Sequence, residues 1–143
     1  MSSIKTEIII NASREKVWEI LTDFQNYPTW NPFIISIQGE PKAGSRLINT
    51  LLNGQKTMTF KPRVLKVVPN AHFEWLGSLW FKGIFDGRHY FKIEEIGPNQ
   101  VKLIHGEDFS GLLSSSILKQ IGEQTLQNFI KMNGALKLQA EKD

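Results

Sequence analysis

Hydrophobic residues change their spacing along the first third of the chain, and the changes predict its elements. The β-branched run at residues 8–10 is typical of a strand, and Ser13 then suits the N-cap of a helix. The helix is indicated by an apolar stripe with helical spacing, formed by Val17, Ile20, Leu21 and Phe24. Pro28 fits the first turn of a second, very short helix, and Pro32 prevents its continuation. We therefore expect one strand followed by two short helices.

From Phe33 onward the spacing becomes that of strands. Ile35 and Ile37 alternate with polar neighbours, and Asn53-Gly54 is a strong hairpin signal. Proline cannot donate a hydrogen bond to its neighbour strand, so Pro62 marks an edge or a bulge. Further strands are expected at residues 47–52, 57–68, 71–76, 80–96 and 100–109. The total is about seven antiparallel strands.

A long amphipathic helix is predicted over residues 115–140, with Ser114 as its cap. Its apolar face consists of Ile117, Leu118, Ile121, Thr125, Phe129, Met132 and Leu136. At about 1.5 Å per residue the helix is about 39 Å long, enough to span a curved antiparallel sheet. Periodicity by itself therefore indicates an α+β fold.

Two adjacent strands of the predicted sheet carry polar residues on an otherwise apolar face. Alternation places His89 and Phe91 on this face of one strand, and His105 and Glu107 on the same face of the next. The short turn at residues 97–99 favours a hairpin register in which His89 faces Glu107 and Phe91 faces His105. The register predicts a polar group within apolar surroundings, and a slip by one residue would turn one set outward.

Two sets of residues, in order along nearly the whole chain, carry a family resemblance. They are Ala12-Ser13, Val17-Trp18, Leu21, Asp23-Phe24, Tyr27-Pro28, Trp30-Asn31-Pro32-Phe33, and then Lys61-Pro62, Val64-Leu65, Pro69-Asn70, Trp75-Leu76-Gly77, Phe85-Asp86-Gly87, His89, Phe91, His105-Gly106-Glu107 and Phe109-Ser110-Gly111-Leu112-Leu113. This pattern resembles the superfamily of START domains, polyketide cyclases and birch-pollen-type allergens, and within it the small bacterial polyketide cyclase/dehydrase-like proteins. The resemblance implies one helix-grip domain over residues 1–143, in which the sheet wraps around the C-terminal helix and leaves a cavity.

Three functions are compatible with such a cavity. The first is binding or transport of a hydrophobic small molecule, such as a lipid, a polyketide or an aromatic metabolite. The second is a cyclase or dehydratase reaction in which a cavity His or Glu moves a proton. The third is a protein-interaction module, as one branch of the superfamily suggests. Whether the protein is an enzyme stays open at this point.

The candidate ligand-binding residues are polar anchors and apolar walls. They are His89, His105, Glu107, Phe91, Phe85, Trp75, Trp30, Phe129 and Leu118. The polar members have an alternative, purely structural interpretation, because buried polar groups must be hydrogen-bonded whether or not they bind a ligand. Trp80 and Phe81 are expected to form a flap over the cavity mouth.

Composition narrows the range of partners. The 143 residues, 41% of them hydrophobic, carry a net charge of +3 on scattered lysines and arginines, so no nucleic-acid partner is expected. The absence of cysteine excludes disulfides and thiol catalysis, and the three histidines lack a short zinc-binding spacing. We expect no cofactor and no metal. Asp86 and Asp108 are expected to face solvent.

The expected location is the cytoplasm, because the chain shows no leader and no apolar run of membrane-spanning length. No integral membrane contact is expected, whereas transient contact with a membrane surface is compatible with an exposed aromatic flap. The expected state is a monomer or a weak homodimer.

Overall fold

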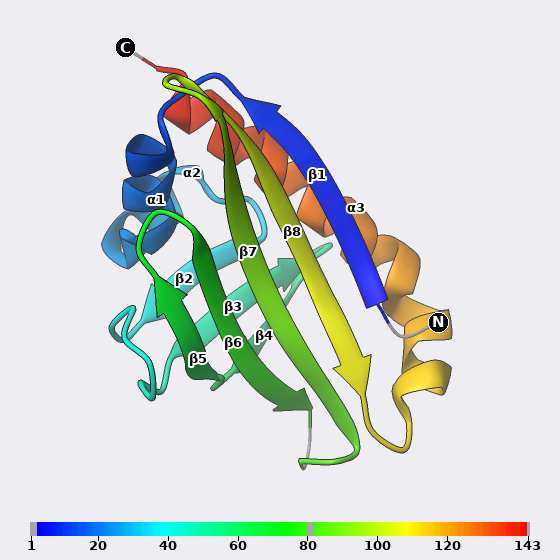
Figure 1. The fold of residues 1–143 in the computed structure, drawn as a ribbon. Coiled ribbons are helices and arrows are strands. Elements are labelled where there is room, and N and C mark those ends of the chain that lie inside the picture. The colour runs from blue at the N-terminus through cyan, green and yellow to red at the C-terminus, as the bar shows by residue number, and fades with distance from the viewer. Residues whose placement is uncertain (1–2, 80–81, 143) are drawn as a thin grey trace.

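A five-stranded antiparallel sheet forms one side of the molecule, with strand order β1-β8-β7-β6-β5 (Figure 1). The computed structural model describes residues 3–79 and 82–142. The strands of this sheet are β1 (Ser3–Ile10), β5 (Arg63–Val68), β6 (His72–Leu79), β7 (Phe85–Gly97) and β8 (Gln100–Ser110). The hairpin register predicted for β7 and β8 is confirmed, since Ile93 pairs with Leu103.

A second, three-stranded sheet has the order β2-β3-β4. It consists of β2 (Ile34–Gln38), β3 (Ile48–Asn53) and β4 (Lys56–Phe60). The prediction of one strand over residues 57–68 was wrong, because β4 ends at Phe60 and pairs with β3, whereas β5 pairs with β6. Pro62 lies in the break, and its carbonyl oxygen accepts a hydrogen bond from the Leu47 amide at 2.8 Å. The sheet change at this proline gives eight strands instead of about seven.

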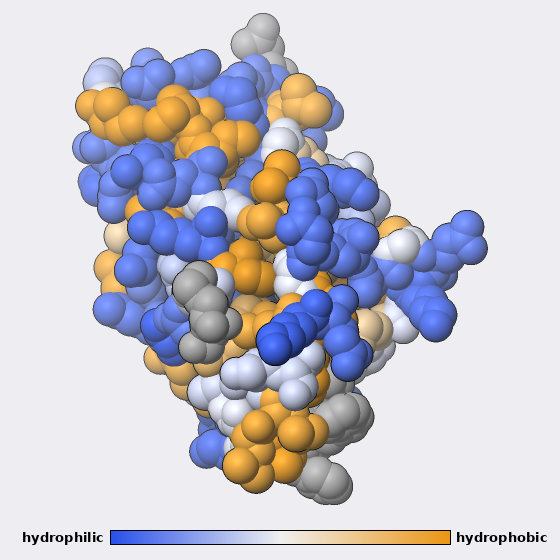
Figure 2. Space-filling view, turned by 90° about the vertical axis from the view of Figure 1, so that its right-hand side faces the viewer, coloured by the Kyte–Doolittle hydropathy of each residue, from blue (hydrophilic) through white to orange (hydrophobic). Residues whose placement is uncertain are grey.

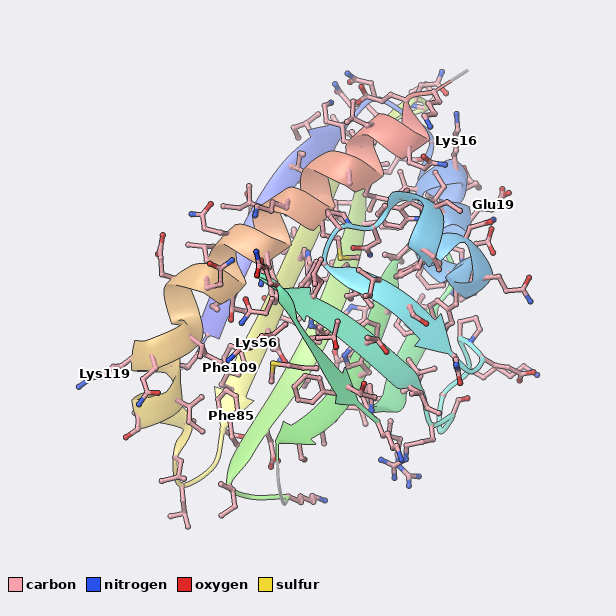
Figure 3. The ribbon with its side chains drawn as sticks, turned by 180° about the vertical axis from the view of Figure 1, so that it is seen from behind. Lys16, Glu19, Lys56, Phe85, Phe109 and Lys119 are labelled. Atoms are coloured by element: carbon pink, nitrogen blue, oxygen red, sulfur yellow. The ribbon has the colours of Figure 1, made fainter. Side chains whose placement is uncertain are left out.

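The helices cover one face of these sheets. α1 (Arg14–Thr22), the 3-10 turn η1 (Phe24–Asn26) and α2 (Tyr27–Trp30) follow β1, and α3 (Ser114–Ala140) closes the chain. Ser13 caps α1 as predicted, accepting a hydrogen bond from the Lys16 amide at 3.2 Å. Figure 3 shows α3 crossing β8 and β7 diagonally, and α3 packs against β1, β8 and β7. The α+β helix-grip arrangement predicted from the sequence is therefore confirmed.

The two halves of α3 have different surroundings. Its second half belongs to the core, where Phe129, Met132 and Leu136 are completely buried. Its first half contributes Ile117 and Ile121 to the lining of a cavity. The second half of α3 is therefore packed in the core, whereas the first half borders the cavity.

Backbone hydrogen bonds hold the start of α3, without the help of a serine side chain. The N-cap residue is Leu113, and no side chain caps the helix, so the prediction of a Ser114 cap was wrong. The Leu113 amide instead donates to the Ile84 carbonyl oxygen at 2.9 Å. Gly111 makes this close approach feasible: its φ is +110°, and a Cβ there would lie 2.6 Å from the same oxygen.

Asp86 closes the connection between β6 and β7. It is buried, and it accepts hydrogen bonds from the Ser78 hydroxyl at 2.7 Å and from the Gly83 amide at 3.0 Å. The expectation that Asp86 faces solvent was therefore wrong, because its carboxylate satisfies the donors of this turn. Asp108 is partly exposed and forms an ion pair with Arg88.

Exposed leucines lie in the connection between β8 and α3. Leu112 is 85% exposed and Leu113 is 42% exposed. Figure 2 shows a group of hydrophobic atoms at the lower end of the molecule, where Figure 1 places that connection. No helix in the described part of the chain is both long enough and apolar enough to cross a membrane.

Candidate functional site

A cavity of about 210 Å³ lies between the two sheets and the first half of α3. Aromatic rings form much of its wall: Phe33, Phe60, Trp75, Phe85 and Phe109. The rings of Phe85 and Phe109 are stacked in parallel, with centroids 5.3 Å apart, and Figure 3 shows both near the first turns of α3. The cavity is therefore a mostly apolar chamber with flat walls.

His89 and Glu107 form the polar end of this cavity. They are directly opposite each other on β7 and β8, and both line the chamber. His89 Nδ1 lies 3.4 Å from Glu107 Oε1, and the two side chains are 6% and 18% exposed. The pair faces any molecule that enters the chamber.

A buried network continues behind His89, away from the cavity. His89 Nε2 lies 2.7 Å from His105 Nε2, and His105 Nδ1 lies 2.8 Å from Asn133 Oδ1 on α3. The Asn133 amide donates to the Thr6 hydroxyl at 2.8 Å, and this hydroxyl donates to the His105 carbonyl oxygen at 2.7 Å. The network joins β1, β7, β8 and α3 through four side chains.

The direction of these hydrogen bonds assigns the protons. The Thr6 hydroxyl uses its only proton on the His105 carbonyl, so it accepts from the Asn133 amide nitrogen, and Asn133 Oδ1 faces His105. His105 Nδ1 therefore carries a proton, which it donates to Asn133. In neutral His105, Nε2 must then accept a hydrogen bond from the Nε2–H group of His89. His89 Nδ1 is left as the ring atom that faces Glu107, 3.4 Å from its Oε1 atom.

His105 is held neutral by its surroundings. Complete burial is the main cause that holds the pKa of its imidazole well below its usual range, and the neighbouring His89 lowers that pKa further. The hydrogen bond to Asn133 acts in the opposite direction but is the smallest contribution. Its ring stacks on Phe129 at 4.1 Å and on Phe91 at 4.3 Å between centroids. His105 is therefore a core residue that orients His89.

Gly87 makes room for the Glu107 carboxylate. A Cβ at Gly87 would overlap Glu107 Oε2 and would lie 2.9 Å from its carboxyl carbon. The two residues belong to neighbouring strands, and Gly87 also lines the cavity. The absence of a side chain at this position lets the carboxylate lie flat beside His89.

A Gly87→Ala substitution should displace Glu107 from His89 while changing the free energy of unfolding by less than about 1 kcal/mol, since only the end of a flexible side chain must move. Nitrogen NMR of the His89 ring and urea unfolding would measure the two effects. Gly106→Ala is the matched control, because its Cβ would lie 2.7 Å from the Ile4 carbonyl oxygen. Backbone cannot move aside easily, so this control should cost about 2 kcal/mol. Equal stability losses in the two variants would contradict the interpretation.

Asn49 adds a further polar group that the sequence reasoning missed. It is 2% exposed and lines the cavity from β3. Its Oδ1 atom has no hydrogen-bond partner among the described residues. The same oxygen has almost no accessible surface, so it lies within the cavity wall and does not face a bound molecule.

The sequence-predicted site residues fall into three groups. His89, Glu107, Trp75 and Phe85 line the cavity. His105, Phe91 and Phe129 lie behind it in the core, each no more than 1% exposed. Trp30 packs half-buried against the core, 5.1 Å from Tyr27, and Leu118 borders a separate shallow groove beside β1. Trp80 and Phe81, expected as a flap, lie outside the described residues.

Thr6 and Asn133 are functional positions that the sequence reasoning passed over. Thr6 shares a strand face with Ile8 and Ile10, and Asn133 follows Phe129 by one helical turn. Either position could have been found as a polar residue on a predicted buried face. Among the described residues, no cluster of three His, Asp or Glu side chains has the geometry of a metal site.

The strands of the described residues, the α3 grip and the mostly apolar cavity together form a helix-grip fold. The sequence model of the family described as "Polyketide cyclase / dehydrase and lipid transport" matches residues 1–132. The chain belongs to this family. The comparison with curated protein sequences found no significant match to this chain.

Solved structures support the fold. A START superfamily protein from Mycobacterium smegmatis is 21% identical, with a TM-score of 0.75 over 99% of this chain and 98% of that one. The Zhui aromatase/cyclase from Streptomyces sp. R1128 is 15% identical, with a TM-score of 0.80 over 97% and 93%. Norcoclaurine synthase from Thalictrum flavum, in complex with dopamine and hydroxybenzaldehyde, is 12% identical, with a TM-score of 0.73 over 99% and 88%. At these identities the likeness establishes the fold alone.

Proposed function

We propose that this protein binds a compact, mostly apolar small molecule with one polar end in the cavity between the sheets and α3. The observation that carries the proposal is a mostly apolar chamber with the His89–Glu107 pair in its wall. The Asn49 side chain adds a further polar group to the lining of the same chamber. Such a combination of apolar walls and a few placed polar groups is typical of small-molecule sites.

The size of the cavity favours a molecule of one or two rings. Its volume of about 210 Å³ is below the roughly 300 to 1,000 Å³ typical of sites for drug-sized ligands. A two-chain phospholipid is therefore a poor fit for the chamber in this form. Norcoclaurine synthase, of similar fold, is described with two single-ring molecules, an amine and an aldehyde. The choice of polar group must come from this chain's own residues.

A modest affinity is expected. Burial of about 150 to 250 Å² of aromatic surface at about 25 cal/mol per Å² contributes about 4 to 6 kcal/mol before the cost of association. Since the cost of association reduces this gain, dissociation constants no tighter than about 30 µM are expected for small aromatic probes. Titration of one-ring, two-ring and phospholipid probes by fluorescence or native mass spectrometry tests the proposal. Binding of no aromatic probe would contradict it.

Filling the cavity should weaken binding. Ile121→Trp places a large ring in the chamber, and this should lower the affinity for aromatic probes by at least about tenfold while the protein stays folded. Leu138→Trp is the matched control on the same helix, because Leu138 is 72% exposed. Fluorescence titration with circular dichroism would measure both effects. An equal effect of the two variants would locate binding elsewhere.

A second candidate function is proton-transfer chemistry of the cyclase or dehydratase kind. The observation that favours it is an imidazole and a carboxylate 3.4 Å apart, His89 and Glu107, at the cavity surface. Unchanged turnover of a candidate substrate in His89→Ala and Glu107→Gln variants would remove this candidate. A cytoplasmic location and a monomeric or weakly dimeric state remain part of the proposal.

A further inference from the structure

The charges around the cavity favour one sign of ligand. Among the described residues that line it, Glu107 is the only carboxylate, His89 is the only base, and none is lysine or arginine. A ligand with a carboxylate or phosphate would bring a second negative charge beside Glu107, without a fixed positive charge to balance it. A neutral or cationic polar end avoids this repulsion.

The acceptors at the polar end lack donors. Glu107 Oε1 is 3.4 Å from His89 Nδ1, beyond a normal hydrogen bond, and Oε2 lies over Gly87, where there is no side chain. The Glu107 carboxylate is therefore available to a group that carries several N–H donors.

An ammonium group meets this description best. It provides up to three N–H donors and a positive charge opposite the carboxylate. The aromatic walls add a second attraction, because the faces of rings such as Trp75, Phe85 and Phe109 attract cations. The rest of an arylalkyl amine would lie between the same rings.

We propose that the ligand is an aromatic or arylalkyl amine whose ammonium group pairs with Glu107. This inference rests on the proposed function and specifies its ligand. His89 Nε2 already donates to His105, and His89 Nδ1 lies 3.4 Å from Glu107 Oε1, so the ammonium group supplies the N–H donors that this carboxylate lacks.

Four matched probes test the inference: 2-(2-naphthyl)ethylamine, 2-(2-naphthyl)ethanol, 2-naphthylacetate and 2-ethylnaphthalene. Titration calorimetry measures the affinity of each probe. The amine should bind at least about tenfold more tightly than the alcohol, and 2-naphthylacetate should bind most weakly.

The Glu107→Gln variant should lose the advantage of the amine but still bind 2-ethylnaphthalene. Glu123→Gln is the matched control, since it removes the same charge from an exposed position of α3. Equal affinity for amine and alcohol, or tightest binding of 2-naphthylacetate, would overturn the inference and leave the proposed function intact. Failure of all four probes, including the hydrocarbon, would overturn the proposed function together with the inference.

Discussion

An Asn133→Leu substitution should lower the free energy of unfolding by about 2 to 4 kcal/mol, although leucine has the same number and branching of side-chain heavy atoms as asparagine. Asn133 is 3% exposed, accepts from His105 Nδ1 and donates to the Thr6 hydroxyl. Leucine removes both partners at once and leaves the His105 donor buried without an acceptor. Each unsatisfied buried group costs about 1 to 3 kcal/mol. Urea unfolding of the two proteins measures the difference.

A double variant separates lost hydrogen bonds from altered packing. His105→Phe combined with Asn133→Leu replaces both partners by apolar groups, and phenylalanine keeps the stacking on Phe129 and Phe91. The double variant should therefore recover part of the loss, because it removes the unsatisfied His105 donor, although the His89 Nε2–H group then loses its acceptor. Additive losses in the double variant would show that the network contributes little and that packing dominates.

The shared face of the polar pair was predictable, because alternation places His89 and Glu107 on the same face of neighbouring strands. Their direct pairing depends in addition on an irregularity near the turn: Gly97 pairs with Gln100, whereas Glu95 pairs with Val101, and this shift brings His89 opposite Glu107. The prediction of the family rests on residues spread along the chain. Local spacing was sufficient for the strand faces and for the family.

Depth within the fold was not predictable from alternation. His89, Phe91 and His105 lie on one face of the sheet, yet only His89 lines the cavity. The difference arises where α3 crosses the strands, since Phe129 packs directly on His105. A side-chain period of two identifies the face of a strand but gives no information about what covers each position.

The change of sheet at Pro62 and the role of Asn133 were missed for related reasons. The strand-like composition of residues 57–68 continues across the break, whereas the choice of partner strand depends on long-range packing. Asn133 interacts with His105, 28 positions away in sequence, and with Thr6, 127 positions away. A polar residue within an apolar helical stripe indicates a buried partner but does not identify it.

Mild acid should destabilise the protein through His105. In the unfolded chain this imidazole binds a proton below about pH 6.5, whereas in the folded protein burial holds its pKa well below that value. The unfolded state then binds more protons, so stability is complete above about pH 6.5 and decreases as the pH falls toward the folded pKa. One such group should cost about 1.4 kcal/mol between about pH 7.5 and 5.5. Urea unfolding at several pH values measures this loss.

The His105→Phe/Asn133→Leu variant isolates the contribution of His105, because it keeps His72 and His89 and removes only the buried imidazole from the titration. The difference in stability between the two proteins should shrink by about 1.4 kcal/mol over the same pH range. Measurements should stay above about pH 5.5, since Glu74 and Glu141, whose pKa values are lowered by their partners, lose stabilising charge only in stronger acid. Parallel pH profiles in the two proteins would show that His105 takes up its proton as readily in the fold as in the unfolded chain, and would remove the basis for its neutral assignment.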